Sequence, residues 1–324
     1  MKVLYAHEFG QKIRSSAYKY YPPMQKRMGG RIVGVNGRRD WASLKKEVES
    51  YSPDLVLVRG DRNELFEIPL SLGIPYIVCE NDVSSWRQEG FAREKKMLEN
   101  AAGIIFTSDA HKDYLVNQGL SLPPSITVWL RPNRDSLHFD PLPKLPGKHL
   151  VYAGGLVVKR NRSGPWGYRC YHEIFCAFRD SGWTVHAYPT RPTAGGIREY
   201  QKLGITVHPT IPANKIYTEL SQYTAGLHGY AWKKVPARSM DYALHCMPNK
   251  TWEYLAAGIP TVTVNGGPSS RVITSGGWGI EVGRDLSGLD SLELPSIDPQ
   301  VRNSQVIDED IDRLVDFCEN TLDT

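Results

Sequence analysis

Two hydrophobic periodicities alternate along the first part of the chain. Continuous apolar runs, typical of strands buried on both faces, occupy residues 2–6, 53–61, 74–82 and 103–108. Segments with apolar residues at helical spacing separate them, at 41–51, at 91–102 and after Ser108, which is a predicted N-cap. This order predicts parallel strands covered by helices, an α/β domain over residues 1–140.

A proline-rich stretch divides this series from a second one. Residues 139–148 read FDPLPKLPGK, have no periodicity and are predicted to form a linker. Strands are then predicted at 149–155, 183–189, 205–212, 225–230 and 259–265, and helices at 168–182, 214–223 and 250–257. We therefore expect a second α/β domain at 149–305. A terminal helix is expected within 306–324, in a position to cross back to the first domain.

Composition narrows the class of protein. The 324 residues are 41% hydrophobic and 23% charged, which is typical of a globular protein. The five cysteines are scattered and predict buried thiols rather than disulfides or a zinc site. No apolar run is long enough to span a membrane, and the N-terminus turns polar too early for a signal peptide, so a cytoplasmic location is expected.

Charge is distributed unevenly. Residues 1–46 carry eleven basic and two acidic side chains, whereas residues 281–324 carry three basic and twelve acidic ones. The acidic segment docking on the basic one explains this pattern, and so does a basic surface that meets a polyanionic acceptor or an anionic membrane.

The sequence VYAGGLVVKRNRSG at 151–164 combines a buried strand, a glycine pair and cations. Gly154 and Gly155 would let a ligand approach the backbone, and Lys159, Arg160 and Arg162 would neutralise a diphosphate. The stretch is neither a Walker loop nor a dinucleotide fingerprint. A tight turn followed by a solvated basic loop is the alternative.

The sequence NKTWEYLAAGIPTVTV at 249–264 predicts a short helix followed by a strand. Asn249 is expected to cap the helix and Gly258 to end it. Lys250 and Glu253 are three residues apart and so share one face near the helix N-terminus. They suit either a surface ion pair or a ligand site in which the lysine meets a phosphate and the glutamate accepts hydrogen bonds from a ribose.

Together with TIPANKIYTELSQYTAGLHGY, these two motifs resemble the C-terminal half of GT-B fold glycosyltransferases, close to glycosyltransferase family four. The segments IIFTSDAHKDYL and LRPNRDSLHF are similar to the end of their N-terminal half. The resemblance implies two Rossmann-like, doubly wound domains that face an interdomain cleft. The first would bind the acceptor and the second a nucleotide-sugar donor.

The resemblance also implies roles for residues of the second domain. Glu253 would bind the ribose hydroxyls, and Lys250 the phosphates. Gly154, Gly155 and Lys159 would hold the diphosphate, supported by Arg160 or Arg162, and the backbone near Ile211 would lie against the base. Many retaining members carry a second glutamate eight positions before the ribose-binding one, where this chain has His245.

The sequence CENDVSSW at 79–86 offers a candidate general base at the end of a predicted strand. Asp82 is the first candidate, with Glu80 behind it, and its position is similar to that of the base in phage β-glucosyltransferases that modify hydroxymethylcytosine in DNA. Asp82 would equally serve as a helix or turn cap. His7 and the adjacent Glu8, at the end of the first strand, are weaker candidates.

These observations predict a hexosyltransferase that moves a sugar from a UDP- or GDP-sugar to a hydroxyl acceptor. No DxD-like acidic pair stands at a strand end in the second domain, so no metal and no cofactor beyond the donor are expected. The acceptor would be a saccharide, a lipid-linked glycan or a hydroxymethylated base of DNA. The alternatives are a sugar-nucleotide 2-epimerase of the same fold and a non-catalytic nucleotide-sugar binding protein.

Overall fold

The computed structural model divides the chain into two compact units. Unit 1 comprises Met1–Asn133 and Val306–Thr324, and unit 2 comprises Arg134–Gln305. The structure describes residues 1–7, 19–34, 41–59, 65–80, 91–190, 193–212 and 215–322, without the side chains of His7, Arg238 and Tyr242. Each unit is built on one parallel six-stranded sheet, which confirms the predicted doubly wound α/β class.

The sheet of unit 1 has the strand order β2-β1-β3-β4-β5-β6. Its strands are β1 (Val3–His7), β2 (Arg31–Gly34), β3 (Leu55–Arg59), β4 (Tyr76–Glu80), β5 (Gly103–Phe106) and β6 (Ser125–Thr127). Its helices are α1 (Tyr21–Met28), α2 (Trp41–Tyr51), α3 (Glu67–Leu72), α4 (Phe91–Glu99), α5 (Asp109–Asn117) and α13 (Ile311–Asn320), with a 3-10 turn η9 (Ile307–Asp310) before the last.

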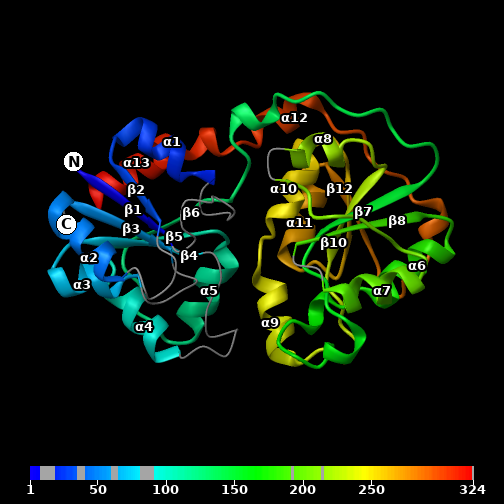
Figure 1. Ribbon diagram of the computed structural model, residues 1–324, viewed down its shortest axis with the longest axis horizontal. Helices are drawn as coiled ribbons and strands as arrows, with labels where there is room; N and C mark the ends of the chain where they lie inside the picture. Colours follow the sequence, from blue (N-terminus) through cyan, green and yellow to red (C-terminus); the bar gives the residue numbers. More distant parts are fainter. Residues whose placement is uncertain are drawn as a thin grey trace. The chain divides into compact units, whose positions relative to one another are not determined.

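Helices α1 and α13 cover one face of this sheet, and α2 to α5 lie on the other (Figure 1). The core beneath α1 and α13 joins alternate strand residues to both helices. Its members include Val3, Tyr5, Leu55, Leu57, Ile77, Tyr21, Met24, Ile311 and Leu314. The acidic tail therefore packs on the basic N-terminal segment, and Arg27 of α1 pairs with Asp312 of α13 at 3.1 Å.

The sheet of unit 2 has the order β12-β11-β10-β7-β8-β9. Its strands are β7 (His149–Gly154), β8 (Thr184–Pro189), β9 (Thr206–Val207), β10 (Ala225–Gly229), β11 (Thr261–Val264) and β12 (Gly279–Val282). Its helices are α6 (His172–Asp180), α7 (Ala194–Lys202), α8 (Ile216–Leu220), α9 (Ala237–His245), α10 (Asn249–Ala256), α11 (Pro268–Ser275) and α12 (Pro299–Ser304). Short 3-10 turns are η4 (Arg134–Leu137), η5 (Lys159–Asn161), η6 (Gly167–Arg169) and η8 (Leu289–Ser291).

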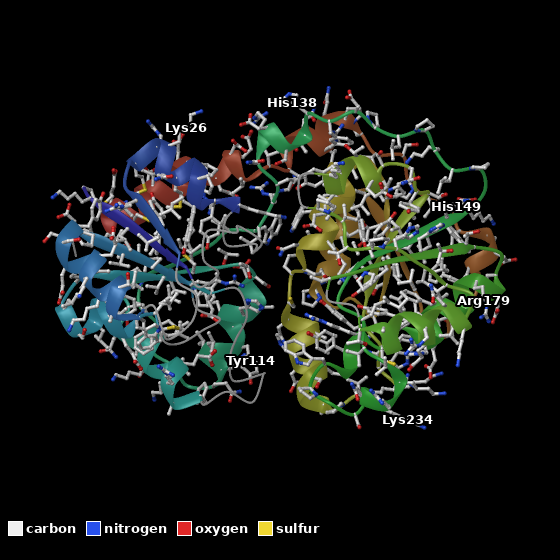
Figure 2. The ribbon with its side chains drawn as sticks, in the orientation of Figure 1. Lys26, Tyr114, His138, His149, Arg179 and Lys234 are labelled. Atoms are coloured by element: carbon white, nitrogen blue, oxygen red, sulfur yellow. The ribbon has the colours of Figure 1, made fainter. Side chains whose placement is uncertain are left out.

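Two apolar clusters fill the two faces of this second sheet. One packs α6 and α7 against it and contains Tyr152, Phe175 and Trp183. The other packs α8 and α10 and contains Val151, Tyr223 and Tyr254. Charged side chains such as Lys26 of α1 and Lys234 are exposed and point away from the cores (Figure 2).

Several predicted elements differ from those observed. The strand expected at 205–212 is only Thr206–Val207, because Pro209 and Pro212 cannot donate to a sheet ladder. The helix expected at 168–182 begins at His172, after the separate 3-10 turn η6. Among the helices of the described residues, none is long and apolar enough to cross a membrane.

Candidate functional site

The candidate donor site of unit 2 lies where the connectivity of its sheet reverses direction. From β7 the chain proceeds to β8 and β9 on one side, and it then continues through β10, β11 and β12 on the other. The loop after β7 and the loop after β10 therefore diverge to opposite faces of the sheet. In open parallel sheets, ligands bind at this switch point, at the carboxyl ends of the strands.

The glycine pair Gly154 and Gly155 stands at the carboxyl end of β7. A Cβ atom on Gly154 would lie 2.9 Å from the Tyr152 Oη, and one on Gly155 would lie 2.8 Å from Arg169 Nη1. The Tyr152 hydroxyl donates a hydrogen bond to the Gly155 carbonyl at 2.8 Å. The glycines therefore let a tyrosine and an arginine pack closely against the loop, and they bring a cation, Arg169, to its backbone.

Lys250 extends over two aromatic rings beneath this loop. Its Nζ lies 4.3 Å from the ring centroid of Tyr152 and 5.7 Å from that of Tyr171, within the range of cation–π attraction. The lysine is in the first turn of α10, which begins at Asn249. The prediction that Asn249 caps this helix is wrong, because Pro248 occupies the cap position and no side chain caps the helix.

The surroundings of Lys250 are electropositive and poorly solvated. Burial lowers its pKa from the ordinary value; nearby Tyr152 opposes this shift, and the charge of Arg169 adds to it. Burial, and then the charge of Lys250, lowers the pKa of His228 well below its usual range. His228 lies on β10, and its Nε2 is 2.5 Å from Ser269 Oγ of α11. The positive charges of Lys250 and Arg169 repel each other, and an anion placed beside them would relieve this repulsion.

Glu253 lies one helical turn after Lys250, with the fully packed Trp252 and Leu255 on the buried side of α10 as predicted. Burial raises the pKa of Tyr217 on α8, and the negative charge of Glu253 raises it further, so the two side chains are electrostatic neighbours. Ile211 and Tyr217 both pack against the cluster that contains Tyr254 of α10. The structure thus places Glu253 and Ile211 on the α8 side of the site.

The cations of the loop after β7 have different environments. Lys159 and Arg160 are exposed in the 3-10 turn η5. Arg162 is buried, and its Nη2 pairs with Glu173 Oε1 of α6 at 3.1 Å. Of the three predicted cations, the structure therefore leaves Lys159 and Arg160 at the surface and commits Arg162 to an ion pair within the protein.

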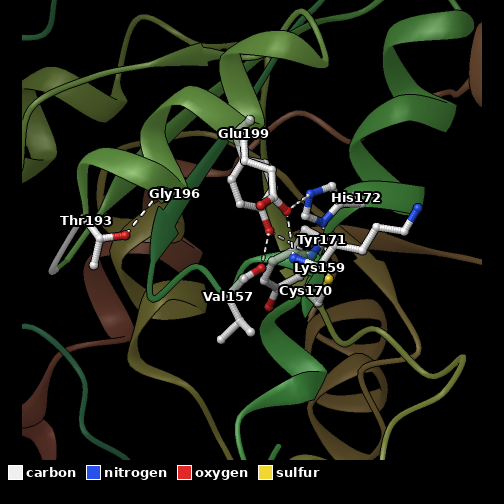
Figure 3. A network of polar contacts seen from close by, with 9 residues as sticks. Val157, Lys159, Cys170, Tyr171, His172, Thr193, Gly196 and Glu199 are labelled. Atoms are coloured by element: carbon white, nitrogen blue, oxygen red, sulfur yellow. Dashed lines mark hydrogen bonds and ion pairs between the residues drawn. The ribbon is translucent and has the colours of Figure 1, made fainter. Parts of the chain in front are cut away.

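A polar network fixes this loop to α7 (Figure 3). Glu199 Oε1 accepts a hydrogen bond from the Lys159 backbone N–H at 2.6 Å and lies 2.7 Å from His172 Nε2. The Tyr200 hydroxyl donates to the Val157 carbonyl at 2.8 Å. Adjacent residues of one helix thus hold two points of the loop, which sets the position of the backbone from which Lys159 projects.

The candidate bases belong to unit 1. Glu80 ends β4 and has no exposed surface, and the register of the sheet pairs it with Phe106 of β5. His7 ends β1, but its side chain lies outside the described part of the chain, as do Asp82 and Glu8. Among the residues that the structure describes, no group of three or more His, Cys, Asp or Glu is placed to hold a metal ion. The expectation of metal independence stays a prediction.

Three residues of the candidate donor site were not predicted from the sequence: Arg169, His228 and Tyr217. Arg169 and His228 reach Lys250 from another loop and another strand, and no local spacing relates them. For Arg169 the sequence does contain a signal, because an arginine is unusual in the middle of an aromatic stretch such as WGYRCY. Arg169 Cζ lies 4.7 Å from the ring centroid of Trp166, which holds this cation by stacking.

Comparison with known proteins relates the chain by fold rather than by sequence. No protein-family model and no curated protein sequence matches it. Sucrose-phosphate synthase from Thermosynechococcus elongatus is similar in structure, with a TM-score of 0.64 and 12% identity over 99% of this chain and 96% of that one. HepE from Anabaena, solved in complex with UDP, has a TM-score of 0.60 and 11% identity over 99% and 98%.

An enzyme of another class has a similar structure. The UDP-GlcNAc 2-epimerase of Methanocaldococcus jannaschii matches with a TM-score of 0.54 and 11% identity, over 97% of this chain and 99% of that one. At these identities the likeness is one of fold. The chain therefore has the GT-B fold, two Rossmann-like units each built on a parallel six-stranded sheet.

Proposed function

We propose that the protein is a glycosyltransferase that transfers a sugar from a nucleoside diphosphate sugar to a hydroxyl group. One observation carries the proposal: Lys250 reaches from the start of α10 to the ring of Tyr152, beside the Gly154–Gly155 loop and Arg169, at the switch point of a parallel sheet. Cations and backbone groups converge there from separate parts of unit 2. Because these cations and backbone groups lie close together, they favour a ligand that carries two negative charges close together, such as a diphosphate.

The donor would lie across α10. Its diphosphate would meet Lys250, Arg169 and the loop after β7, with Lys159 or Arg160 closing on it from the surface. Glu253 would accept hydrogen bonds from the ribose diol, and the base would lie near Ile211 and Tyr217. The UDP complex of the structurally similar HepE supports uracil as the first base to test.

The chemistry follows from charge development. As the glycosidic bond to the leaving diphosphate breaks, negative charge accumulates on the phosphate oxygens, and preorganised cations stabilise that charge most in the transition state. A general base of unit 1 would remove the proton of the acceptor hydroxyl. Asp82 is our first choice. Glu80 would first have to be uncovered, because its side chain has no exposed surface.

The experiment that identifies the donor is a thermal-shift panel of UDP, GDP, ADP and their sugars. A ligand at a hundred times its Kd stabilises the folded state by about 2.7 kcal/mol. We expect one nucleoside diphosphate to raise the Tm of the wild type and to have less effect on Glu253→Ala. If no nucleotide raises the Tm at millimolar concentration, the proposal is wrong.

A sugar-nucleotide 2-epimerase is the second candidate, supported by the structural similarity to the enzyme from M. jannaschii. Incubation with the donor alone separates the two. A transferase needs an acceptor to consume the donor productively, whereas an epimerase converts the donor sugar without one. Appearance of an epimer in donor-only samples would replace the transferase proposal.

The acceptor remains a choice among a saccharide, a lipid-linked glycan and a hydroxymethylated base of DNA. A DNA acceptor would engage basic side chains, so binding would fall steeply between dilute and physiological salt. We expect a weak salt dependence for an uncharged saccharide. Turnover in the presence of EDTA tests the proposed independence from metal.

A further inference from the structure

Unit 1 contains a pocket that the proposed donor chemistry does not use. Its volume is about 510 Å³, which lies in the range of small-molecule sites. The lining residues come from the start of α5, from β6 and the segment after it, and from η9 and α13: Asp109, Lys112, Ser125, Ile126, Thr127, Trp129, Arg131, Asp310 and Arg313. All of them belong to unit 1.

One wall of the pocket is β6, the last strand in the order of the described sheet of unit 1. The Val128 N–H donates to the Phe106 carbonyl at 2.8 Å, and the Pro124 carbonyl accepts from the Ile104 N–H at 3.0 Å. Alternate residues of a parallel strand point their backbone groups to the same side. The backbone N–H groups of Ser125 and Thr127 therefore point away from β5, toward the edge on which the described residues place no further strand.

A second wall consists of two arginines that share one carboxylate. Asp310 Oδ1 accepts from Arg313 Nη1 at 2.7 Å, and its Oδ2 accepts from Arg131 Nη2. Arg131 and Asp310 are buried, whereas the Arg313 side chain is 59% exposed. Because two positive charges face one negative charge, this wall has a net positive charge, and its buried pair fixes the position of the guanidinium of Arg131.

The remaining lining adds a third cation, an indole and a carboxylate. Lys112 and Trp129 are half-buried, and Asp109 is exposed. Cations and backbone amides suit one anionic group. The Asp109 carboxylate would repel an extended polyanion but would accept hydrogen bonds from hydroxyl groups, and the indole offers an apolar face to a ring. These features describe a ligand with one charged end and a hydroxylated body.

We propose that this pocket binds a small anionic carbohydrate, a pyranose with one phosphate or carboxylate. The anionic group would lie between Lys112, Arg313 and the edge amides of β6, and the sugar ring would lie against Trp129. The site goes beyond the proposed function, because its lining shares no residue with the donor site of unit 2 or with the candidate bases of unit 1. Its ligand does not need to be a substrate of the transfer reaction.

Isothermal titration calorimetry of the full chain without donor tests the proposal. Glucose 6-phosphate and glucuronate are the probes, with glucose and inorganic phosphate as partial ligands. We expect one site for at least one charged sugar, with binding by Lys112→Ala and by Arg313→Ala weakened about tenfold or more, since each removes a charge-assisted contact. Lys46→Ala, an exposed lysine of α2 in the same unit, is the matched control.

Each other outcome overturns the proposal. Failure of both charged sugars to bind removes the site, and equal binding by the two pocket variants and the wild type places it elsewhere. If glucose binds as tightly as the charged sugars, the pocket does not require an anionic group. If inorganic phosphate binds as tightly as the charged sugars, the pocket does not recognise the sugar ring. Loss of binding in Lys250→Ala would assign the signal to the donor site instead. Lys112→Ala remains informative if Arg313→Ala loosens α13, because Lys112 is outside the Asp310 network.

Discussion

A chain of three histidines predicts that unit 2 loses stability in acid. His186 of β8 lies between His149 at the start of β7 (Figure 2) and His208, with ring nitrogens 2.9 Å apart on each side. His149 Nε2 is 2.9 Å from the Pro146 carbonyl, which can only accept. The hydrogen-bond network therefore assigns one direction: His208 donates to His186, and His186 donates to His149.

The size of the expected stability loss follows from the pKa of His186, the central imidazole of the three. Burial, then the neighbouring His208 and His149, lowers the pKa of His186 to about 4, against about 6.5 for an exposed imidazole. Between these two values the unfolded chain binds more protons than the folded one, so stability falls as the pH falls. The linkage relation gives a loss of about 2 kcal/mol at pH 5.0 relative to pH 7.5, and about 3 kcal/mol well below pH 4.

Urea denaturation at pH 7.5 and 5.0, followed by tryptophan fluorescence, measures this loss. The quantity to compare is the change in unfolding free energy between the two pH values, in the wild type and in His186→Asn. We expect the wild type to lose about 2 kcal/mol more than the variant. The exposed His138, also in unit 2, provides the control His138→Asn, which should behave like the wild type. An identical pH dependence in wild type and His186→Asn would show that protonation of His186 does not cause the loss of stability.

Three further predictions concern stability and donor binding. Asp310→Ala should destabilise unit 1 by about 3 to 5 kcal/mol in denaturant melts, because it removes the carboxylate of a buried ion pair with Arg131; a loss below 1 kcal/mol would contradict this. Gly226→Ala should lower the Tm markedly, since the added Cβ would lie 2.3 Å from the Tyr254 ring; an unchanged Tm would show that the ring yields freely. Glu253→Ala should raise the KM for the donor through lost ribose hydrogen bonds, and steady-state kinetics with an unchanged KM would remove Glu253 from the site.

Much of the fold could be predicted because its signals are local. The helix at 41–51 has the bounds of α2, and Ser108 caps α5 by accepting from the Ala110 N–H at 3.3 Å. In both cases the pattern of a few adjacent residues decides the structure. Four elements of unit 1, α1, β2, α3 and β6, have no counterpart among the predicted ones. The sequence of α1 does not look helical because it has two prolines, but both lie in the first turn, where a helix tolerates proline.

The residues of the candidate site also fall into two groups, those that lie in local sequence motifs and those that only the tertiary fold brings to the site. Gly154, Gly155, Lys250 and Glu253 lie in short motifs, and the structure brings the glycines and Lys250 together. The aromatic stretch around Arg169 makes this arginine conspicuous in the sequence but does not assign it to the site. Its place there depends on the packing of η6 against the loop after β7, a contact set by the tertiary fold.

Unit 2 is proposed to bind a nucleoside diphosphate through the cations at its switch point. The direct test is calorimetric titration of uridine and UDP into the wild type and Lys250→Ala. If the thermal-shift panel selects another nucleotide, that nucleoside and its diphosphate replace uridine and UDP. We predict that the wild type binds the diphosphate far more tightly than the nucleoside, and that Lys250→Ala loses most of this difference while it keeps its affinity for the nucleoside. If the variant retains the full preference for the diphosphate, Lys250 does not bind the diphosphate and the proposed donor site is wrong.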